Sequence, residues 1–221
     1  MKQLTLALLL WLLPALSLAN DGFGGLTATG LQFAQTDKVR LVREDLFLSP
    51  ARVEVRYRFH NDGPQSVQGE IIFPLPPISL PALHESGFAL DERQLAADNP
   101  VNFTLHIDGK AQPVQVERIA VIEPPYEEGR KASLNYDSPG KDVTAVLKQY
   151  DIPLSLAYEQ VTAALARLPQ DKRKRLQELQ LVDVYEGEAP MPLWSIMLRY
   201  HWPQSFAAGQ DLRIEHSYTP A

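Results

Sequence analysis

Apolar and polar side chains alternate along residues 52–60. The apolar positions share one phase of the alternation: Val53, Val55, Tyr57 and Phe59. A period of two is typical of a β-strand with one face against a core, so this segment predicts such a strand. Turn-forming residues follow at 61–64, and a second apolar run at 70–73 ends in prolines. Residues 52–77 therefore predict a β-hairpin.

The same alternation recurs at 101–107, 193–202 and 212–218, and the turn Asp108-Gly109 predicts that 114–121 returns beside 101–107. Residues 20–36 are rich in glycine and are expected to be a loop that leads into a first strand near 31–33. Shorter apolar pieces at 38–42 and 45–48 predict two more strands, while 78–99 is expected to be an irregular surface connection. One phase of these strands predicts a common core, which includes Val55, Tyr57, Phe59, Phe103, Leu105, Ile196, Leu198 and Ile214.

The apolar spacing changes to that of helices between residues 142 and 181. Asp142 and Ser155 are candidate N-caps, and Pro153 and Pro169 separate short helices. Hairpin-linked strands need a second sheet to bury their apolar faces, so the fold class is mainly β. We expect an antiparallel β-sandwich, immunoglobulin-like or related, with a small α-helical insertion at about 140–185.

Composition narrows the range of partners and chemistry that this chain can have. The chain has 221 residues, of which 45% are hydrophobic, and a formal net charge of −6. That charge argues against nucleic acid as a partner, because neutralising phosphates needs a concentrated basic surface. There are no cysteines, so disulfides, thiolate metal sites and cysteine nucleophiles are excluded.

The first residues predict an export signal. Lys2 precedes the apolar stretch 4–13, and Ser17 and Ala19 form a small-x-small cleavage site. We expect residues 1–19 to be a signal peptide, residues 20–221 to form the mature domain, and no transmembrane segment to remain after cleavage. The expected location is the bacterial periplasm or the extracellular space.

Several separate segments resemble one family. They are Gly24-Gly25-Leu26, the segment 43–49, the end of the predicted hairpin at Phe73-Pro74-Leu75-Pro76, and the segment 198–220 with its Phe206-Ala207-Ala208-Gly209 and Glu215-His216-Ser217-Tyr218 motifs. In this order they resemble a bacterial exported family catalogued as domain of unknown function 4424. The hairpin is also similar, at the level of fold, to the vault and inter-alpha-trypsin module. The resemblance implies an exported bacterial protein of undescribed function and carries no catalytic residues.

Candidate chemistry is sparse. The histidines are His60, His84, His106, His201 and His216, and none has the spacing of a metal site. The loop around His84 has residue types suited to acid–base chemistry but lacks a nucleophile elbow. The glycine-rich start lacks the ending of a P-loop, and the acidic runs at 123–128 and 183–188 lack a calcium-loop pattern. We therefore assign no catalytic, cofactor-binding or metal-binding residue.

Two functions of different class stay open. The first is a non-catalytic binding or assembly module of the cell envelope, with another envelope protein as partner. The second is a hydrolase or carbohydrate-processing enzyme that uses carboxylates from its loops. For the first, the proline-rich connections at 73–88 and 124–126 carry the candidate contacts, which are Leu75, Ile78, Leu83, Phe88 and Tyr126. Burial of these side chains in the core is the competing interpretation.

Overall fold

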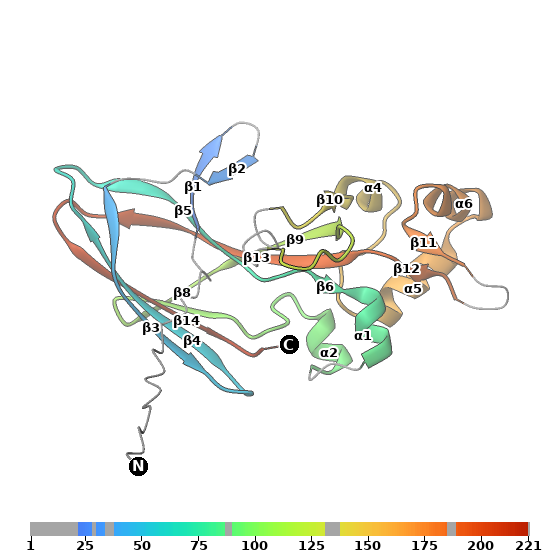
Figure 1. Ribbon diagram of the computed structural model, residues 1–221, viewed down its shortest axis with the longest axis horizontal. Helices are drawn as coiled ribbons and strands as arrows, with labels where there is room; N and C mark the ends of the chain where they lie inside the picture. Colours follow the sequence, from blue (N-terminus) through green and yellow to red (C-terminus); the bar gives the residue numbers. More distant parts are fainter. Residues whose placement is uncertain are drawn as a thin grey trace, which may run out of the picture.

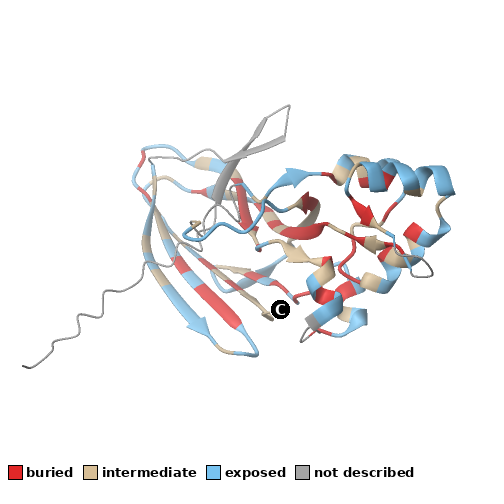
Figure 2. Cartoon of the chain, turned by 45° about the vertical axis from the view of Figure 1, so that its right-hand side comes forward, coloured by how far each residue is buried: buried red, intermediate tan, exposed pale blue. Residues whose placement is uncertain are grey.

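Two antiparallel β-sheets pack face to face, and short helices gather at one end of them (Figure 1). The computed structural model describes residues 22–27, 30–33, 38–86, 90–130, 138–184 and 189–220. The predicted fold class is confirmed, because the chain is mainly β with antiparallel sheets and a few short helices. Buried positions run along the facing strands and along the inner sides of the helices (Figure 2).

The smaller sheet has five strands in the order β3-β4-β14-β7-β8. Their bounds are β3 (Val39–Leu48), β4 (Val53–Asn61), β14 (Asp211–Tyr218), β7 (Thr104–Ile107) and β8 (Lys110–Gln112). The larger sheet has the order β10-β9-β13-β5-β1-β2, with β6 also beside β13. Its bounds are β10 (Lys141–Asp142), β9 (Gln115–Ile122), β13 (Ser195–Phe206), β5 (Val67–Pro74), β6 (Ile78–Ser79), β1 (Gly22–Thr27) and β2 (Gly30–Phe33).

The predicted inward phase is the phase that is buried. Every residue of the predicted core belongs to one cluster between the sheets, and only Phe59 among them is half-buried rather than buried. The centre of the cluster is aromatic: the ring of Phe103 stacks on Tyr200 at 4.3 Å between centroids, and Phe73 lies 5.5 Å from Phe103. Arg58 on the opposite phase of β4 is exposed.

Two predictions about strands were wrong. The pieces expected at 38–42 and 45–48 form the single strand β3, whose pairing with β4 shifts register between Leu41 and Arg43. This bulge interrupts the alternation, which is why the sequence pattern resembles two strands. Residues 22–27 were expected to be a loop but form β1, which pairs with β5 at Gly22 and Ile72. Glycine-rich segments have little intrinsic strand preference, so pairing decides their conformation.

Three helices lie within residues 140–185: α4 (Thr144–Gln149), α5 (Tyr158–Arg167) and α6 (Gln170–Glu178). The predicted N-caps Asp142 and Ser155 were wrong, since α4 and α5 have Val143 and Ala157 at those positions. The side chains of Asp142 and Ser155 still accept hydrogen bonds just before the helices, from the amides of Thr144 (2.8 Å) and Ala157 (3.1 Å). A small sheet of β11 (Val182–Asp183) and β12 (Met191–Pro192) lies beside these helices.

The connection at 78–99 is not irregular as expected. It contains α1 (Leu80–Ser86) and α2 (Glu92–Ala96). Pro81 lies in the first turn of α1, where its missing amide costs nothing. Asp91 and Gln94 form a capping box at α2, with Gln94 N–H donating to Asp91 Oδ1 at 2.9 Å. Helix α1 contacts α5 and β12, so it joins the helical end of the molecule.

The turn that follows β4 is held by one buried side chain. Asn61 Nδ2 donates to the carbonyls of Gln65 (2.8 Å) and Phe206 (2.9 Å), and Gly63 N–H donates to Asn61 Oδ1 (2.9 Å). These bonds tie the turn between β4 and β5 to the far end of β13. The two sheets are therefore linked at this corner by side-chain hydrogen bonds.

Asn61→Ala should lower the free energy of unfolding by about 1–3 kcal/mol, because it leaves buried backbone groups unpaired. Urea unfolding measures the change. Asp62→Ala is the matched control, since it removes contacts of a half-exposed carboxylate with Arg40 and His60 and should cost under about 1 kcal/mol. Equal losses in the two variants would contradict this role for Asn61.

Candidate functional site

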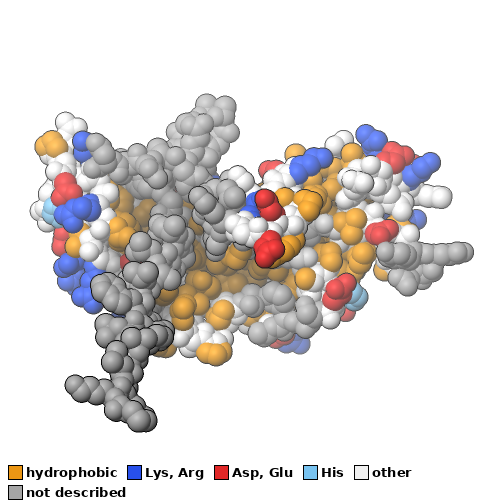
Figure 3. All heavy atoms as spheres, in the orientation of Figure 1, with side chains coloured by type: hydrophobic (Ala, Val, Ile, Leu, Met, Phe, Trp, Pro, Cys, Tyr) orange, Lys and Arg blue, Asp and Glu red, His pale blue; other side chains and the backbone are white. Residues whose placement is uncertain are grey.

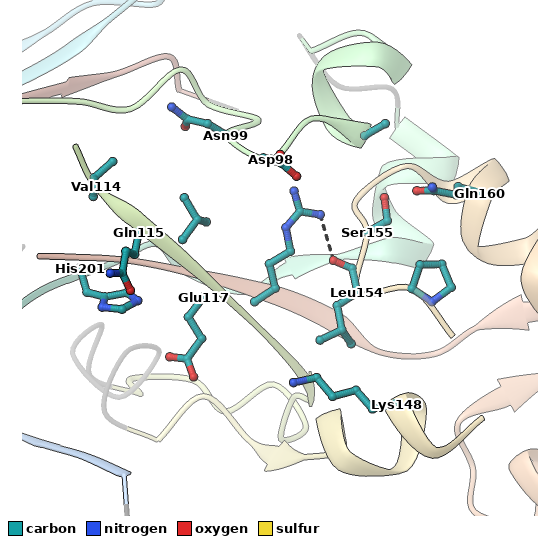
Figure 4. A pocket seen from close by; sticks show the side chains of 14 residues that line it. Asp98, Asn99, Val114, Gln115, Glu117, Lys148, Leu154, Ser155, Gln160 and His201 are labelled. Carbon is teal, nitrogen blue, oxygen red and sulfur yellow. Dashed lines mark hydrogen bonds between the residues drawn. The ribbon is translucent and has the colours of Figure 1, made fainter. Parts of the chain in front are cut away.

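A cleft of about 840 Å³ opens where the sandwich meets the helical end (Figure 4). One side is β9, the second is the segment that follows α2, and the third is formed by α4, α5 and the loop between them. Its lining residues are Ala96, Asp98, Asn99, Val114, Gln115, Val116, Glu117, Arg118, Lys148, Pro153, Leu154, Ser155, Gln160 and His201. The volume lies in the range of natural ligand sites, and the lining mixes apolar groups with both signs of charge.

Strand β9 presents different side chains on its two faces. It pairs with β13 through Gln115↔His201, Glu117↔Arg199 and Ile119↔Met197. Glu117 forms an ion pair with Arg199, whose Nη1 lies 3.2 Å from Glu117 Oε2. The alternate phase of β9 carries Val116, Arg118 and Ala120, and it faces the core.

Arg118 connects the walls of the cleft through hydrogen bonds. Its Nη1 donates to the carbonyl of Leu154 at 2.9 Å, and its Nη2 donates to the carbonyl of Ala97. Burial lowers the pKa of the Arg118 guanidinium, and the nearby Tyr200 and Asp98 act in the opposite direction. A charged side chain hydrogen-bonded to two carbonyls fixes the spacing between β9, the α2 side and the helical side.

A second set of hydrogen bonds holds the segment after α2. Tyr200 O–H donates to Asn99 Oδ1 at 3.1 Å, and the same oxygen accepts a bond of 2.8 Å from the amide of Phe103. Asn99 Nδ2 donates to the carbonyl of Phe103 at 2.9 Å. Burial raises the pKa of the Tyr200 phenol, so Tyr200 is a neutral donor at ordinary pH. This wall of the cleft is therefore fixed to the core before any ligand arrives.

The polar groups of the cleft are not arranged as a nucleophile and its base. His201 Nδ1 is hydrogen-bonded to Oε1 of the buried Glu70 on β5. Ser155 Oγ accepts a bond of 3.1 Å from the amide of Ala157 in its own loop. Triad chemistry requires the hydroxyl and the imidazole to be partners. The arrangement is suited to binding a polar ligand along β9.

Three of the other histidines contact side chains outside the cleft. His84 is exposed on α1 and stacks on Tyr158 at 4.3 Å between ring centroids, and His60 Nδ1 lies 2.6 Å from Asp211 Oδ1. His216 is fully buried among aromatic rings. Among the residues that the structure describes, no group of three or more His, Cys, Asp and Glu could hold a metal ion.

The predicted partner contacts that the structure describes differ widely in exposure. Leu75 and Leu83 are buried in the core, with exposed fractions of 6% and 7%, and Ile78 is half-buried. Tyr126 is 93% exposed, and Phe88 lies outside the described residues. A partner could reach Leu75 and Leu83 only if the core packing around them were displaced. Binding through the five predicted residues stays a prediction. None of the four that the structure describes lines the cleft.

Further apolar side chains are exposed on β3, at Leu41, Leu46, Phe47 and Leu48. In the face shown in Figure 3, apolar side chains also gather between the sandwich and the helical end. Within the described ranges, no helix is both long enough and apolar enough to cross a membrane. The predicted signal peptide, residues 1–19, lies outside these ranges.

Comparisons with known proteins identify the family expected from the sequence. A family model described as a domain of unknown function (DUF4424) matches residues 19–221. No curated protein matches the chain. Among solved structures, the chain is similar to a protein of Legionella pneumophila subsp. pneumophila described as "a putative nutrient binding protein", with 13% sequence identity and a TM-score of 0.37. The similarity covers 82% of this chain and only 39% of that one.

Proposed function

We propose that this chain, which belongs to the family described as a domain of unknown function (DUF4424), is a non-catalytic binding module of the bacterial cell envelope. The observation that carries the proposal is the cleft of about 840 Å³ along β9. Its walls are held apart by Arg118 and tied to the core through Asn99, so the site is formed before binding. Preformed walls reduce the ordering cost that a ligand must offset.

The side chains that line the cleft favour binding over catalysis. A hydrolase that uses two carboxylates needs both of them to face one bond. Glu117 is instead paired with Arg199 on the face of the sheet opposite to Arg118. Asp98 belongs to the separate wall that follows α2. Binding therefore accounts for this lining better than hydrolysis does.

Export is part of the same proposal and rests on residues 1–19. The positive start, the apolar stretch and the small residues Ser17 and Ala19 are the features of a cleaved signal. The mature chain would then begin at Asn20 in the periplasm or outside the cell. N-terminal sequencing of the protein from the envelope fraction should find Asn20 first, and an intact Met1 there would overturn the cleavage.

Capture from an envelope extract tests the binding function. The mature chain, immobilised as bait, should retain an envelope component that Ala96→Trp does not retain. Ala96 is exposed at the end of α2 and lines the cleft, so an indole there occupies the ligand's volume. The retained component should be recovered with its mass unchanged after prolonged incubation, since no reaction is proposed.

Ala163→Trp is the matched control, because Ala163 is exposed on α5 and is not part of the cleft lining. Both variants should unfold within a few degrees of the wild-type midpoint, and only Ala96→Trp should lose binding. Equal retention by both variants would place the binding surface elsewhere. Conversion of the retained component into a product would favour the hydrolase instead.

A further inference from the structure

On the side of β9 that faces the cleft, the described part of the chain places no strand beside Val116 and Arg118. On this side Ala120 N–H donates to Thr144 Oγ1 at 2.9 Å, and the amide of Val143 donates to the Ala120 carbonyl at 2.9 Å. The backbone groups of Ala120 therefore point away from β13. Strand β10 continues the pairing on this side, but only at Val121 and Ile122.

The direction of the remaining groups follows from strand geometry. Backbone N–H and C=O groups of residues i and i−2 point to the same side of a strand. The backbone groups of Val116 and Arg118 therefore point to the same side as those of Ala120, which is away from β13 and toward the cleft. In the part of the chain that the structure describes, no strand pairs with β9 there before Val121.

The edge is also sheltered. Exposed edges invite sheet-to-sheet association, and proteins usually block them with prolines, bulges or covering elements. Here the walls formed by Asp98 on one side and by Pro153 and Leu154 on the other flank β9. A recessed edge excludes another sheet but admits a single extended chain.

The geometry points to one class of occupant: we propose that an extended polypeptide segment enters the cleft and pairs as an added strand with Val116 and Arg118. Donors and acceptors two residues apart on β9 repeat at about 6.6–6.8 Å, which is the repeat of any extended peptide. Main-chain pairing of this kind gives affinity with little demand on sequence. The inference rests on the proposed binding function and specifies its ligand.

The charges of the cleft agree with a peptide ligand. Its lining carries cations at Arg118 and Lys148 and carboxylates at Asp98 and Glu117. Phosphate-rich ligands need a concentration of positive charge that this lining lacks. A peptide backbone has no net charge and alternates hydrogen-bond donors with acceptors, so a lining with both signs of charge is compatible with it.

The first test uses the unmodified mature protein and a library of random dodecapeptides. Selected peptides should bind wild-type protein and Ala163→Trp but not Ala96→Trp. Single amides of a selected peptide are then N-methylated in turn. Methylation at every second position should weaken binding by about tenfold or more and methylation at the positions between should have little effect, because only every second amide faces β9. Hydrogen exchange at the Val116 and Arg118 amides should slow in the complex.

The second test changes the protein. Val116→Pro removes one edge amide and should weaken peptide binding by about tenfold or more, with little change in the thermal midpoint, because edge strands tolerate proline. Ala163→Trp, which lies outside the cleft lining, should bind as wild type does. If Val116→Pro fails to fold, the N-methyl series on the wild-type protein still decides the question.

The outcomes separate the two proposals. Binding that is insensitive to the parity of N-methylation, or unchanged exchange at Val116 and Arg118, would overturn strand addition. The binding function would stand in that case if envelope capture still depended on Ala96. Capture that is indifferent to Ala96→Trp, together with failure to select cleft-binding peptides, would overturn both.

Discussion

Phe103→Ala should lower the free energy of unfolding by about 3–5 kcal/mol, because it removes a buried ring from the centre of the core. The ring is 3% exposed, stacks on Tyr200 at 4.3 Å and lies 5.5 Å from Phe73. Its neighbours come from both sheets, so the cavity cannot close by moving one side chain. Equilibrium unfolding in urea measures the loss.

Phe47→Ala is the matched control, because it removes the same ring from a position on β3 that is 57% exposed. We expect a cost under about 1 kcal/mol there. Similar losses at the two positions would show that Phe103 does not belong to the packed centre. Both sheets depend on this centre, so a large loss at Phe103 would support their face-to-face packing.

Strand periodicity predicted the core well for a physical reason. A strand buried on one face must place its apolar residues on one phase, so the inward positions of β4, β13 and β14 can be identified without knowing their partners. Ile196, Leu198 and Ile214 are fully buried, as their phase predicts. The family was also predicted correctly, because its motifs are spread along the chain.

Short helices were harder to predict than strands. Helices α1 and α2 span Leu80–Ser86 and Glu92–Ala96, too few residues for a helical period to stand out. Local signals were nevertheless present: Pro81 in a first turn, and Asp91 three residues before Gln94. These caps indicate where a helix begins, but tertiary contacts such as those of α1 with α5 decide whether it forms.

The cleft could not be predicted, because its walls come from segments far apart in sequence. One sign of it is visible in the pattern. Arg118 lies on the apolar phase of its strand, between Val116 and Ala120. A charged residue on an inward phase needs a polar partner, and here the partners are the carbonyls of Leu154 and Ala97. The sequence alone does not show which distant segments provide them.

Acidification should destabilise the protein through His216. Burial lowers the pKa of His216 to about 3, whereas an ordinary histidine titrates near pH 6.5. The unfolded chain therefore takes up a proton below about pH 6.5 that the folded chain accepts only near pH 3. Between these values, the free energy of unfolding should fall by about 1.4 kcal/mol for each unit of decreasing pH, or about 2 kcal/mol from pH 7 to pH 5.

His216→Phe isolates this contribution, because it keeps a ring among Phe73 and Phe103 and removes the titrating group. Urea unfolding at pH 7 and pH 5 should show the loss in the wild type to be about 2 kcal/mol larger than in His216→Phe. His84→Phe, on the exposed surface of α1, should keep the wild-type difference. The same pH dependence in wild type and His216→Phe would mean that the imidazole is not held neutral in the core. If wild type and His84→Phe lose stability between pH 7 and pH 5 and His216→Phe loses about 2 kcal/mol less, this part of the acid sensitivity comes from the buried ring of His216.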